Sequence, residues 1–424
     1  MWGGAIPYLD IWDRKPVGLF LLYMPPAALP FRWGVWAYQA MALAAVVATA
    51  LLVTHMARRV ASDRGALLAG VTYILWLNLA GGQGGQAGVF HNLPMAGAAA
   101  LILANERRRF APDAAAMLLV GIALQIKYSV VFEGVFFGLW IMWRLHQGGM
   151  AMARVMARGV VLASVALLPT AAVAGYYAAI GQGAAFAYAN FFSIAARKAD
   201  PWTVQAGNLA HVTLLLAPLI GMAVAARGAA PARRFVLAWF AVSLGAIIVF
   251  GDWYLHYALP ALLPGAVAAA PFLGKIRKRW SASILLLAAL GGQGVVIGNI
   301  MGRGTTAQFA ALTDAVGHGG GCLYVYSGTP MLYASTGRPA CSRWMFPGHL
   351  YLAHEEGAVG VDQLAEVERI LAREPDAITM RPAVSGERPE VRRRVMAAIG
   401  AYYGLVARLP MGDEIISVYR RRKG

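Results

Sequence analysis

Long apolar segments alternate with short polar connections over roughly the first three hundred residues. The apolar runs lie at about 34–56, 65–80, 88–105, 112–126, 129–143, 159–181, 207–226, 235–250, 258–274 and 281–300. A helix that crosses a membrane needs about 20 apolar residues, so the boundaries of the shorter runs are approximate. The pattern predicts an all-α polytopic membrane domain of about ten transmembrane helices over residues 34–300, preceded by a loop and a juxtamembrane helix in residues 1–33.

The pattern changes after residue 300, where strand-like and helix-like segments alternate. Residues 322–327, 376–380 and 414–420 predict strands. An amphipathic helix is predicted over 362–374, with Asp362 as its N-cap, and another over 389–403. Alternating strands and helices indicate a small C-terminal α/β domain in residues 301–424.

Composition supports a membrane protein. Of the 424 residues, 59% are hydrophobic and 13% are charged, whereas soluble globular proteins carry about 25% charged residues. These values exclude an ordinary soluble enzyme, a disordered chain and a disulfide-dense scaffold. The formal net charge of +17 lies almost wholly in residues 1–304. We therefore interpret it as a signal of membrane orientation and expect no nucleic-acid partner.

Basic residues gather in alternate connections between the apolar runs. The connections around residues 58–64, 107–109, 144–158, 227–234 and 275–279 hold most of those in residues 1–304. The positive-inside rule places these connections in the cytoplasm. Residues 1–33 and the domain after residue 300 then lie on the outer side. No apolar run precedes residues 1–33 to carry them there, so we expect one upstream helix to be missing.

Carboxylates at membrane depth are costly and are functional hypotheses by default. In the membrane region, Asp10, Asp13, Glu133, Asp200 and Asp252 fall on the predicted outer side, so chemistry is expected at that face. Asp10 and Asp13 would share one face of a helix and could act as a general base.

Two cations follow these aspartates directly. Arg14 and Lys15 could hold a phosphate group. The alternative is that this segment is an interfacial anchor, with Tyr8 and Trp12 at the level of the lipid headgroups.

Residues 7–23, PYLDIWDRKPVGLFLLY, also resemble the first outer loop of GT-C glycosyltransferases, in the protein O-mannosyltransferase-like and aminoarabinose-transferase-like branch. That loop commonly reads P-Y-x-D-x-W-D-x-K-P-P-L-L-Y, and this chain departs from it at Val17. A second resemblance joins the segment 253–257, WYLHY, and the following ALPALLPG to the family's late H-Y-x-L-x-L-P-P element. The family has a helix and an acidic residue before the loop, which this chain lacks. The loop matches the family at Tyr8, Asp10, Trp12, Asp13, Lys15, Pro16 and Tyr23.

The resemblance implies a specific reaction. A sugar would pass, with inversion, from a polyprenyl-phosphate donor to a glycolipid, glycan or protein acceptor on the outer face of the membrane. Separately, the abundance of Ala, Gly and Arg indicates a bacterial protein and hence a plasma membrane. Asp10 and Asp13 would be the base and its positioner. No cofactor is expected; Arg14 and Lys15 already supply positive charge, although a divalent metal on the aspartates is left open. The candidates for binding the donor's phosphate and sugar are Arg14, Lys15, Lys127, Arg197, Lys198, His256 and Tyr257.

Further residues have two interpretations each. Glu133 either contacts substrate or pairs with Lys127, and His91 and Asn92 either contact substrate or cap a helix. Cys322 and Cys341 either form a disulfide, which can persist outside the cell, or remain two buried thiols. The other candidate substrate contacts are Tyr8 and Asp252.

Two competing functions remain at this point. The first is a lipid or sugar transporter or flippase, which would be expected to show inverted repeats around a midplane site. The second is a truncated, inactive relative of the glycosyltransferases.

Overall fold

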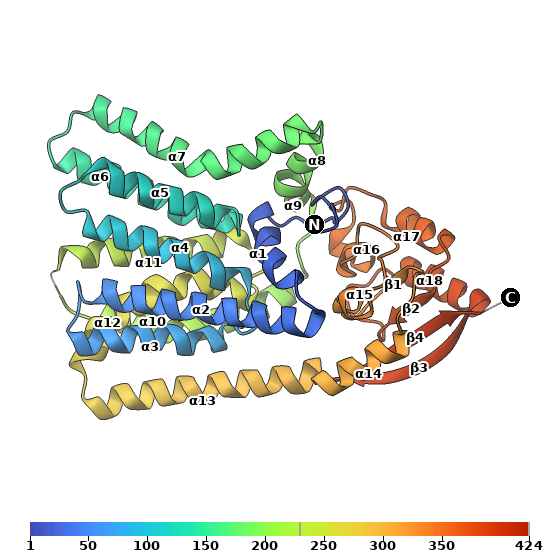
Figure 1. The fold of residues 1–424 in the computed structure, drawn as a ribbon. Coiled ribbons are helices and arrows are strands. Elements are labelled where there is room, and N and C mark those ends of the chain that lie inside the picture. Colours follow the sequence, from blue (N-terminus) through green and yellow to red (C-terminus); the bar gives the residue numbers. More distant parts are fainter. Residues whose placement is uncertain (229, 423–424) are drawn as a thin grey trace.

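The computed structural model describes residues 1–228 and 230–422. A bundle of long helices occupies one side of the molecule, and a small α/β domain occupies the other (Figure 1). The N-terminal segment lies between them and leads into α1 (Val17–Ala27). The long helix α13 (Lys278–Arg303) runs along the bundle and leads into the C-terminal domain.

Each predicted apolar run lies in a helix of the bundle. Eight helical segments in the described residues are long and apolar enough to cross a membrane. The two remaining runs form α3 and α5, which are shorter, with 17 and 15 residues. Besides α13, these helices are α2 (Phe31–Ala57), α3 (Asp63–Leu79), α4 (Ala87–Ala104), α5 (Phe110–Leu124), α6 (Val131–Gln147), α7 (Met152–Ala179), α10 (Trp202–Ala225), α11 (Pro231–Phe250) and α12 (Leu259–Lys275).

Helix α12 is the centre of the bundle, because small residues let its neighbours approach closely. Nearly all of its side chains are buried, including a run of alanines from Ala268 to Ala270. A Cβ atom on Gly65 of α3 would lie 2.5 Å from the carbonyl oxygen of Ala270, so only glycine fits this contact. Helices α7 and α13 expose most of their apolar side chains, as expected for surfaces that face lipid.

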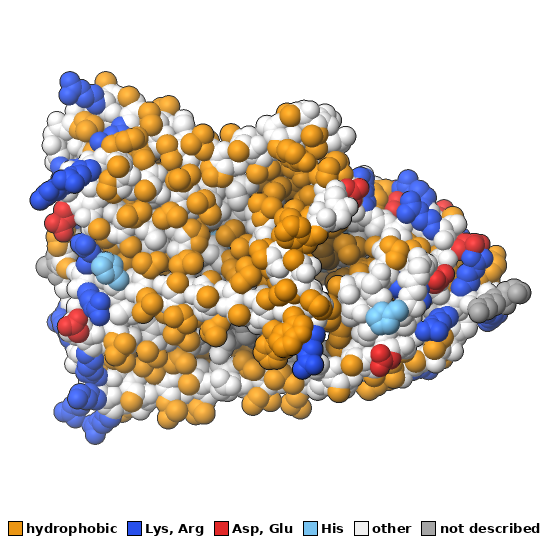
Figure 2. Space-filling view, in the orientation of Figure 1, with side chains coloured by type: hydrophobic (Ala, Val, Ile, Leu, Met, Phe, Trp, Pro, Cys, Tyr) orange, Lys and Arg blue, Asp and Glu red, His pale blue; other side chains and the backbone are white. Residues whose placement is uncertain are grey.

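Basic side chains gather at the end of the bundle that lies away from the C-terminal domain (Figure 2). Buried Asp113 balances two of them, with Arg144 at 3.4 Å and Arg158 at 3.1 Å. The basic connections recognised in the sequence therefore lie at one end of the protein.

The C-terminal domain contains a four-stranded sheet in the order β1-β2-β4-β3. Strands β1 (Leu323–Val325) and β2 (Ala377–Met380) are parallel, and β4 (Glu414–Arg421) is antiparallel to β2 and to β3 (Tyr403–Met411). Three strands match the predictions, but β3 was not predicted. The helices are α14 (Thr306–Val316), α15 (Met331–Thr336), α16 (Gly348–Tyr351), α17 (Gln363–Ala372) and α18 (Pro389–Tyr402).

The predicted helix cap and one of the two predicted states of the cysteines are found in this domain. The Asp362 carboxylate accepts a hydrogen bond of 2.7 Å from the backbone N–H of Ala365 and so caps α17. Cys322 and Cys341 form a disulfide. This bond joins the start of β1 to the loop after α15.

Short helical segments lie between the long helices of the bundle and within the C-terminal domain. The segment between α7 and α10 contains α8 (Gly183–Ala187), the π-helical η2 (Tyr188–Phe192) and α9 (Ser193–Ala196). The remaining turns are η1 (Tyr128–Val130), η3 (Leu255–Ala258) and η4 (Ala353–Glu355). Backbone and side-chain hydrogen bonds join the α8–α9 segment to η4, including Lys198 N–H to the His354 carbonyl at 3.0 Å. The outer loops and the C-terminal domain thus share one interface.

Candidate active site

The N-terminal segment forms a folded loop. Tyr8 has a positive φ of 69° and is buried. Its hydroxyl donates to the Lys15 carbonyl at 2.8 Å and approaches the Asn190 Oδ1 at 3.1 Å. Trp12 is also buried, and its backbone N–H donates to the Arg343 carbonyl at 2.9 Å. The anchor interpretation is therefore wrong for both aromatic residues, whereas the substrate contact of Tyr8 stays a prediction.

The two aspartates have different environments. Residues 7–16 contain no helix, so the prediction that Asp10 and Asp13 share a helix face is wrong. Asp10 is exposed, and its Oδ2 accepts a hydrogen bond of 2.7 Å from the Ile6 N–H. Asp13 is partly buried, and its Oδ1 accepts from the Arg14 N–H at 2.7 Å and lies 3.9 Å from the His349 Nε2. Asp10 thus stabilises the turn that precedes Asp13.

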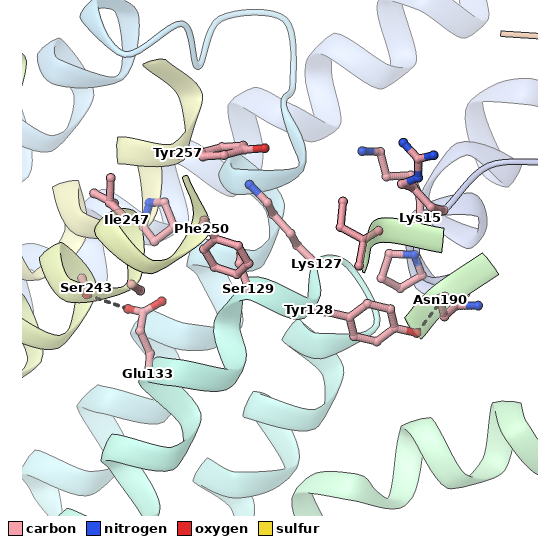
Figure 3. Close-up of a pocket in the computed structure, with 15 residues that line it drawn as sticks. Lys15, Lys127, Tyr128, Ser129, Glu133, Asn190, Ser243, Ile247, Phe250 and Tyr257 are labelled. Atoms are coloured by element: carbon pink, nitrogen blue, oxygen red, sulfur yellow. Dashed lines mark hydrogen bonds between the residues drawn. The ribbon is translucent and has the colours of Figure 1, made fainter. Parts of the chain in front are cut away.

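A cavity of about 220 Å³ lies beside this loop and reaches between α6 and α11 (Figure 3). Lys15 and Lys127 contribute cations to its lining, and Tyr257 contributes an aromatic ring. Its other walls are largely apolar. The remaining lining residues are Arg14, Pro16, Tyr128, Ser129, Glu133, Asn190, Ile194, Ser243, Ala246, Ile247, Phe250 and Pro260.

Lys15 and Lys127 are the cations of this cavity without a carboxylate partner among the described residues. The Lys127 ammonium lies 4.9 Å from the centre of the Tyr257 ring, in a cation–π contact. Burial, assisted by repulsion from Lys15, lowers the pKa of Lys127 to about 8. The predicted pair of Lys127 with Glu133 is wrong, because Glu133 instead accepts hydrogen bonds from Trp239 and Ser243.

The other predicted phosphate-binding cations are paired with carboxylates. The Arg14 guanidinium makes a bidentate ion pair with the Glu355 carboxylate, with N–O distances of 2.8 and 2.5 Å. Arg14 also borders the cavity. The exposed ammonium of Lys198 lies 2.6 Å from Glu356. These contacts join Arg14 and Lys198 to the C-terminal domain, and their contact with the donor stays a prediction.

Arg197 has the same kind of role. It lies 2.8 Å from Asp252 and 3.2 Å from Glu355. Asp252 also accepts from the Asp200 N–H at 3.1 Å. Neither Arg197 nor Asp252 lines the cavity. Arg197 and Asp252 thus form an ion pair between loops, and the donor contact of Arg197 and the substrate contact of Asp252 stay predictions.

Three further candidates lie outside the cavity lining. His91 is fully buried within α4, and the Asn92 side chain donates to the Leu259 carbonyl at 3.0 Å and to the Tyr73 hydroxyl at 3.2 Å. Neither residue caps α4, whose N-cap is Gln86, so the capping interpretation is wrong, whereas the substrate contact of this pair stays a prediction. His256 packs against Tyr257, with ring centres 4.9 Å apart, and so adjoins the cavity from η3.

Sequence reasoning missed residues that organise the site. Asn190 accepts a hydrogen bond of 2.9 Å from Tyr128 and contacts Tyr8, so it joins three segments. Glu355 and His349 approach the loop from the C-terminal domain, and no nearby sequence feature predicts this. The described residues contain no group of three or more His, Cys, Asp or Glu side chains arranged to hold a metal ion.

Comparison with solved structures identifies the architecture. The chain aligns with the crystal structure of ArnT from Cupriavidus metallidurans bound to undecaprenyl phosphate, with a TM-score of 0.58 and 13% identity. The alignment covers 96% of this chain and 88% of that one. The chain has the GT-C fold of ArnT. The apo form of the same ArnT aligns over the same shares of the two chains, with 14% identity and a TM-score of 0.42.

The ArnT-like fold agrees with the order of elements expected from the resemblance, namely an outer loop, a helical bundle and a small domain. No family model and no curated protein sequence matches the chain.

Proposed function

We propose that this protein is an integral-membrane glycosyltransferase that takes a sugar from a polyprenyl-phosphate donor. The observation that carries the proposal is the pair of lysines, Lys15 and Lys127, which border one cavity without carboxylate partners in the described residues. Two cations that repel each other favour an anion between them. The ArnT whose fold this chain shares was crystallised with undecaprenyl phosphate.

The apolar and polar parts of the cavity suit the two parts of such a donor. Phe250 and Ile247 of α11 offer apolar contacts to a lipid or to the faces of a sugar ring. Lys15 and Lys127 offer positive charge to the phosphate. Stabilisation of charge on a departing phosphate by fixed cations is a large contribution to catalysis in sites shielded from water.

The transfer proceeds in a single displacement in this proposal. The acceptor oxygen forms a bond to the anomeric carbon while the bond from that carbon to the phosphate oxygen breaks. The proton of the acceptor hydroxyl passes to Asp13, and Asp10 holds the preceding turn through the Ile6 N–H. Lys15 and Lys127 stabilise the phosphate that leaves, and the anomeric configuration inverts.

The active face is proposed to be periplasmic. It lies beside the C-terminal domain, and the basic connections of the bundle gather at the opposite end (Figure 2). The proposed location is therefore the bacterial inner membrane, with the C-terminal domain outside. The acceptor is a glycolipid, a glycan or a protein of that compartment.

Binding and transfer by the purified full-length protein test the proposal. Lys127→Ala and Lys15→Ala are each expected to weaken binding of undecaprenyl phosphate by about 10–100-fold, the range for a lost hydrogen bond to a charged group. Lys198→Ala is the matched control, because its ammonium pairs with Glu356 on the exposed side of the interface. Unchanged binding in both cavity variants would refute the site. Lipid flipping without sugar transfer would instead favour the transporter alternative.

A further inference from the structure

Glu133 is a buried carboxyl group at the inner end of the cavity, about one turn into α6. It is 3% exposed. Its Oε1 accepts from the Trp239 Nε1 at 2.5 Å and from the Ser243 hydroxyl at 3.1 Å, both from α11. The transfer mechanism above uses none of these three residues. A carboxyl group held at membrane depth requires a reason, because its burial is costly.

The two oxygens of this carboxyl group differ. Oε1 has two donors, whereas Oε2 has no hydrogen-bond partner in the part of the chain that the structure describes. Glu133 and Ser243 both line the cavity, and the side chain points toward its interior (Figure 3). The residues beside them on α11, Ala246 and Ile247, offer no donor, and the buried Ser129 hydroxyl in the same lining makes no hydrogen bond to Glu133. An acceptor that faces an apolar wall is unfavourable unless a bound group supplies a hydrogen bond.

The cavity is therefore polarised from end to end. Lys127 precedes η1, and Glu133 follows six residues later, in the first turn of α6. Cations thus lie at the outer end, and an acceptor lies at the inner end. A prenyl chain would bring no donor to Glu133, and a second phosphate would be repelled by it. A sugar ring brings hydroxyl donors and apolar C–H faces together.

We propose that Glu133 is a specificity-determining residue that accepts a hydrogen bond from a ring hydroxyl of the donor sugar. This inference rests on the proposed function. In this arrangement the phosphate lies at Lys15 and Lys127, and the sugar points inward along α11. Trp239 and Ser243 are positioning residues, because their hydrogen bonds to Oε1 leave Oε2 directed at the sugar. The substrate class is thus a polyprenyl-phosphate sugar with a hydroxyl on the side of the ring away from the phosphate.

The test compares two ligands on the purified full-length protein and on Glu133→Gln. The ligands are undecaprenyl phosphate alone and undecaprenyl phosphate carrying a hexose or a pentose, with mannose, glucose, galactose and arabinose as the panel. The glutamine variant keeps the size of the side chain but presents an amide in place of a carboxylate. For the best sugar of the panel, binding to Glu133→Gln is expected to be about 10–100-fold weaker, whereas binding of undecaprenyl phosphate alone is unchanged.

Ser243→Ala provides a graded second variant, because it removes one of the two bonds that orient Glu133. It is expected to lose a smaller part of the preference for the sugar-bearing ligand, again without a change for undecaprenyl phosphate. If Glu133→Gln weakens the binding of undecaprenyl phosphate and of its sugar-bearing forms equally, the role of Glu133 is structural and the inference is overturned. The inference is also overturned if both variants bind every sugar-bearing ligand with the affinity of the wild type. Failure of the proposed function gives a different result, in which Lys15→Ala and Lys127→Ala leave undecaprenyl-phosphate binding unchanged.

Discussion

Glu355 connects the C-terminal domain to the loop that carries the proposed phosphate-binding lysine. Both of its oxygens contact Arg14, and Oε1 also lies 3.2 Å from Arg197. The side chains of Glu355 and Arg14 are only 8% and 12% exposed. Arg14 directly precedes Lys15, so a contact made by the C-terminal domain fixes the backbone next to the cavity. Replacing Glu355 with alanine is expected to release this loop.

The loss of stability in Glu355→Ala depends on which charged side chains lose their ion-pair partners. Glu355→Ala leaves Arg14 without a carboxylate, whereas Arg197 keeps Asp252 at 2.8 Å. Removing one member of a buried ion pair costs about 3–5 kcal/mol. We expect a value near the lower end, about 3 kcal/mol, because Arg14 also retains its hydrogen bond to Ser193 at 3.0 Å. A loop displaced by about 1 Å from its productive position is expected to slow transfer by about 100-fold.

Hydrogen–deuterium exchange of residues 6–16 measures the release directly. The Trp12 N–H, which donates to the Arg343 carbonyl across the interface, is expected to exchange roughly 100-fold faster in Glu355→Ala. Glu356→Ala is the matched control. The Glu356 side chain is 44% exposed where it meets Lys198, so its loss is expected to cost less than about 1 kcal/mol. Equal exchange rates in the two variants would refute the role of Glu355.

The same contact predicts a response to acid. Burial alone would raise the pKa of Glu355, but the bond to Arg14 and the charges of Arg14, His349 and Arg197 outweigh it and lower the pKa. A lowered pKa in the folded state gives stability that is present above the ordinary carboxyl pKa of about 4.3 and is lost as the pH falls through the lowered value. The protection of residues 6–16 against exchange, taken relative to the intrinsic amide exchange rate at each pH, is therefore expected to fall only in that acidic range.

Three further predictions concern other parts of the protein. Because burial lowers the pKa of Lys127 to about 8, undecaprenyl-phosphate affinity is expected to fall as the pH rises through that value, and Lys127→Arg is expected to abolish this fall in a binding titration. Reducing the Cys322–Cys341 disulfide, which spans 19 residues, is expected to destabilise the C-terminal domain by about 3 kcal/mol, measured as a lower denaturation midpoint. An unchanged midpoint would contradict this. Asp13→Ala is expected to abolish sugar transfer, whereas Asp10→Ala only reduces it; equal rates in the two variants would contradict the assignment of Asp13 as base.

The helices of the bundle could be located from the sequence because lipid leaves few alternatives. Backbone groups in a membrane must be paired within the segment, so an apolar run of sufficient length becomes a helix. Strand β3 had no comparable signal. It contains Gly404 and Pro410, and it lies at the edge of the sheet, where proline is tolerated because one side needs no partner strand. Its inclusion depends on pairing with β4, which is a tertiary interaction.

The site was harder to predict because its charges pair across long sequence separations. Arg14 and Glu355 are 341 residues apart, and Arg197 and Glu355 are 158 residues apart. No sequence feature near either arginine predicts a carboxylate partner so far along the chain. The spacing of Asp10 and Asp13 suggested a helix, but the positive φ of Tyr8 and the hydrogen bond from its N–H to the Ile11 carbonyl produce a turn. The spacing of two residues in the sequence predicts whether their side chains share a face only when the local backbone conformation is known.

Pairing of charges decides which cations can bind a phosphate. An arginine that is already paired with a carboxylate binds a second anion only weakly. The second anion would have to displace the carboxylate or would be repelled by it. Glu355, Asp252 and Glu356 neutralise Arg14, Arg197 and Lys198 in this way. The C-terminal domain supplies two of these three carboxylates. Glu355 and Glu356 pair with Arg14, Arg197 and Lys198, whereas Lys15 and Lys127 keep their charges beside the cavity. In the proposed function the C-terminal domain would therefore help to select the anion, although it contributes no residue to the cavity lining.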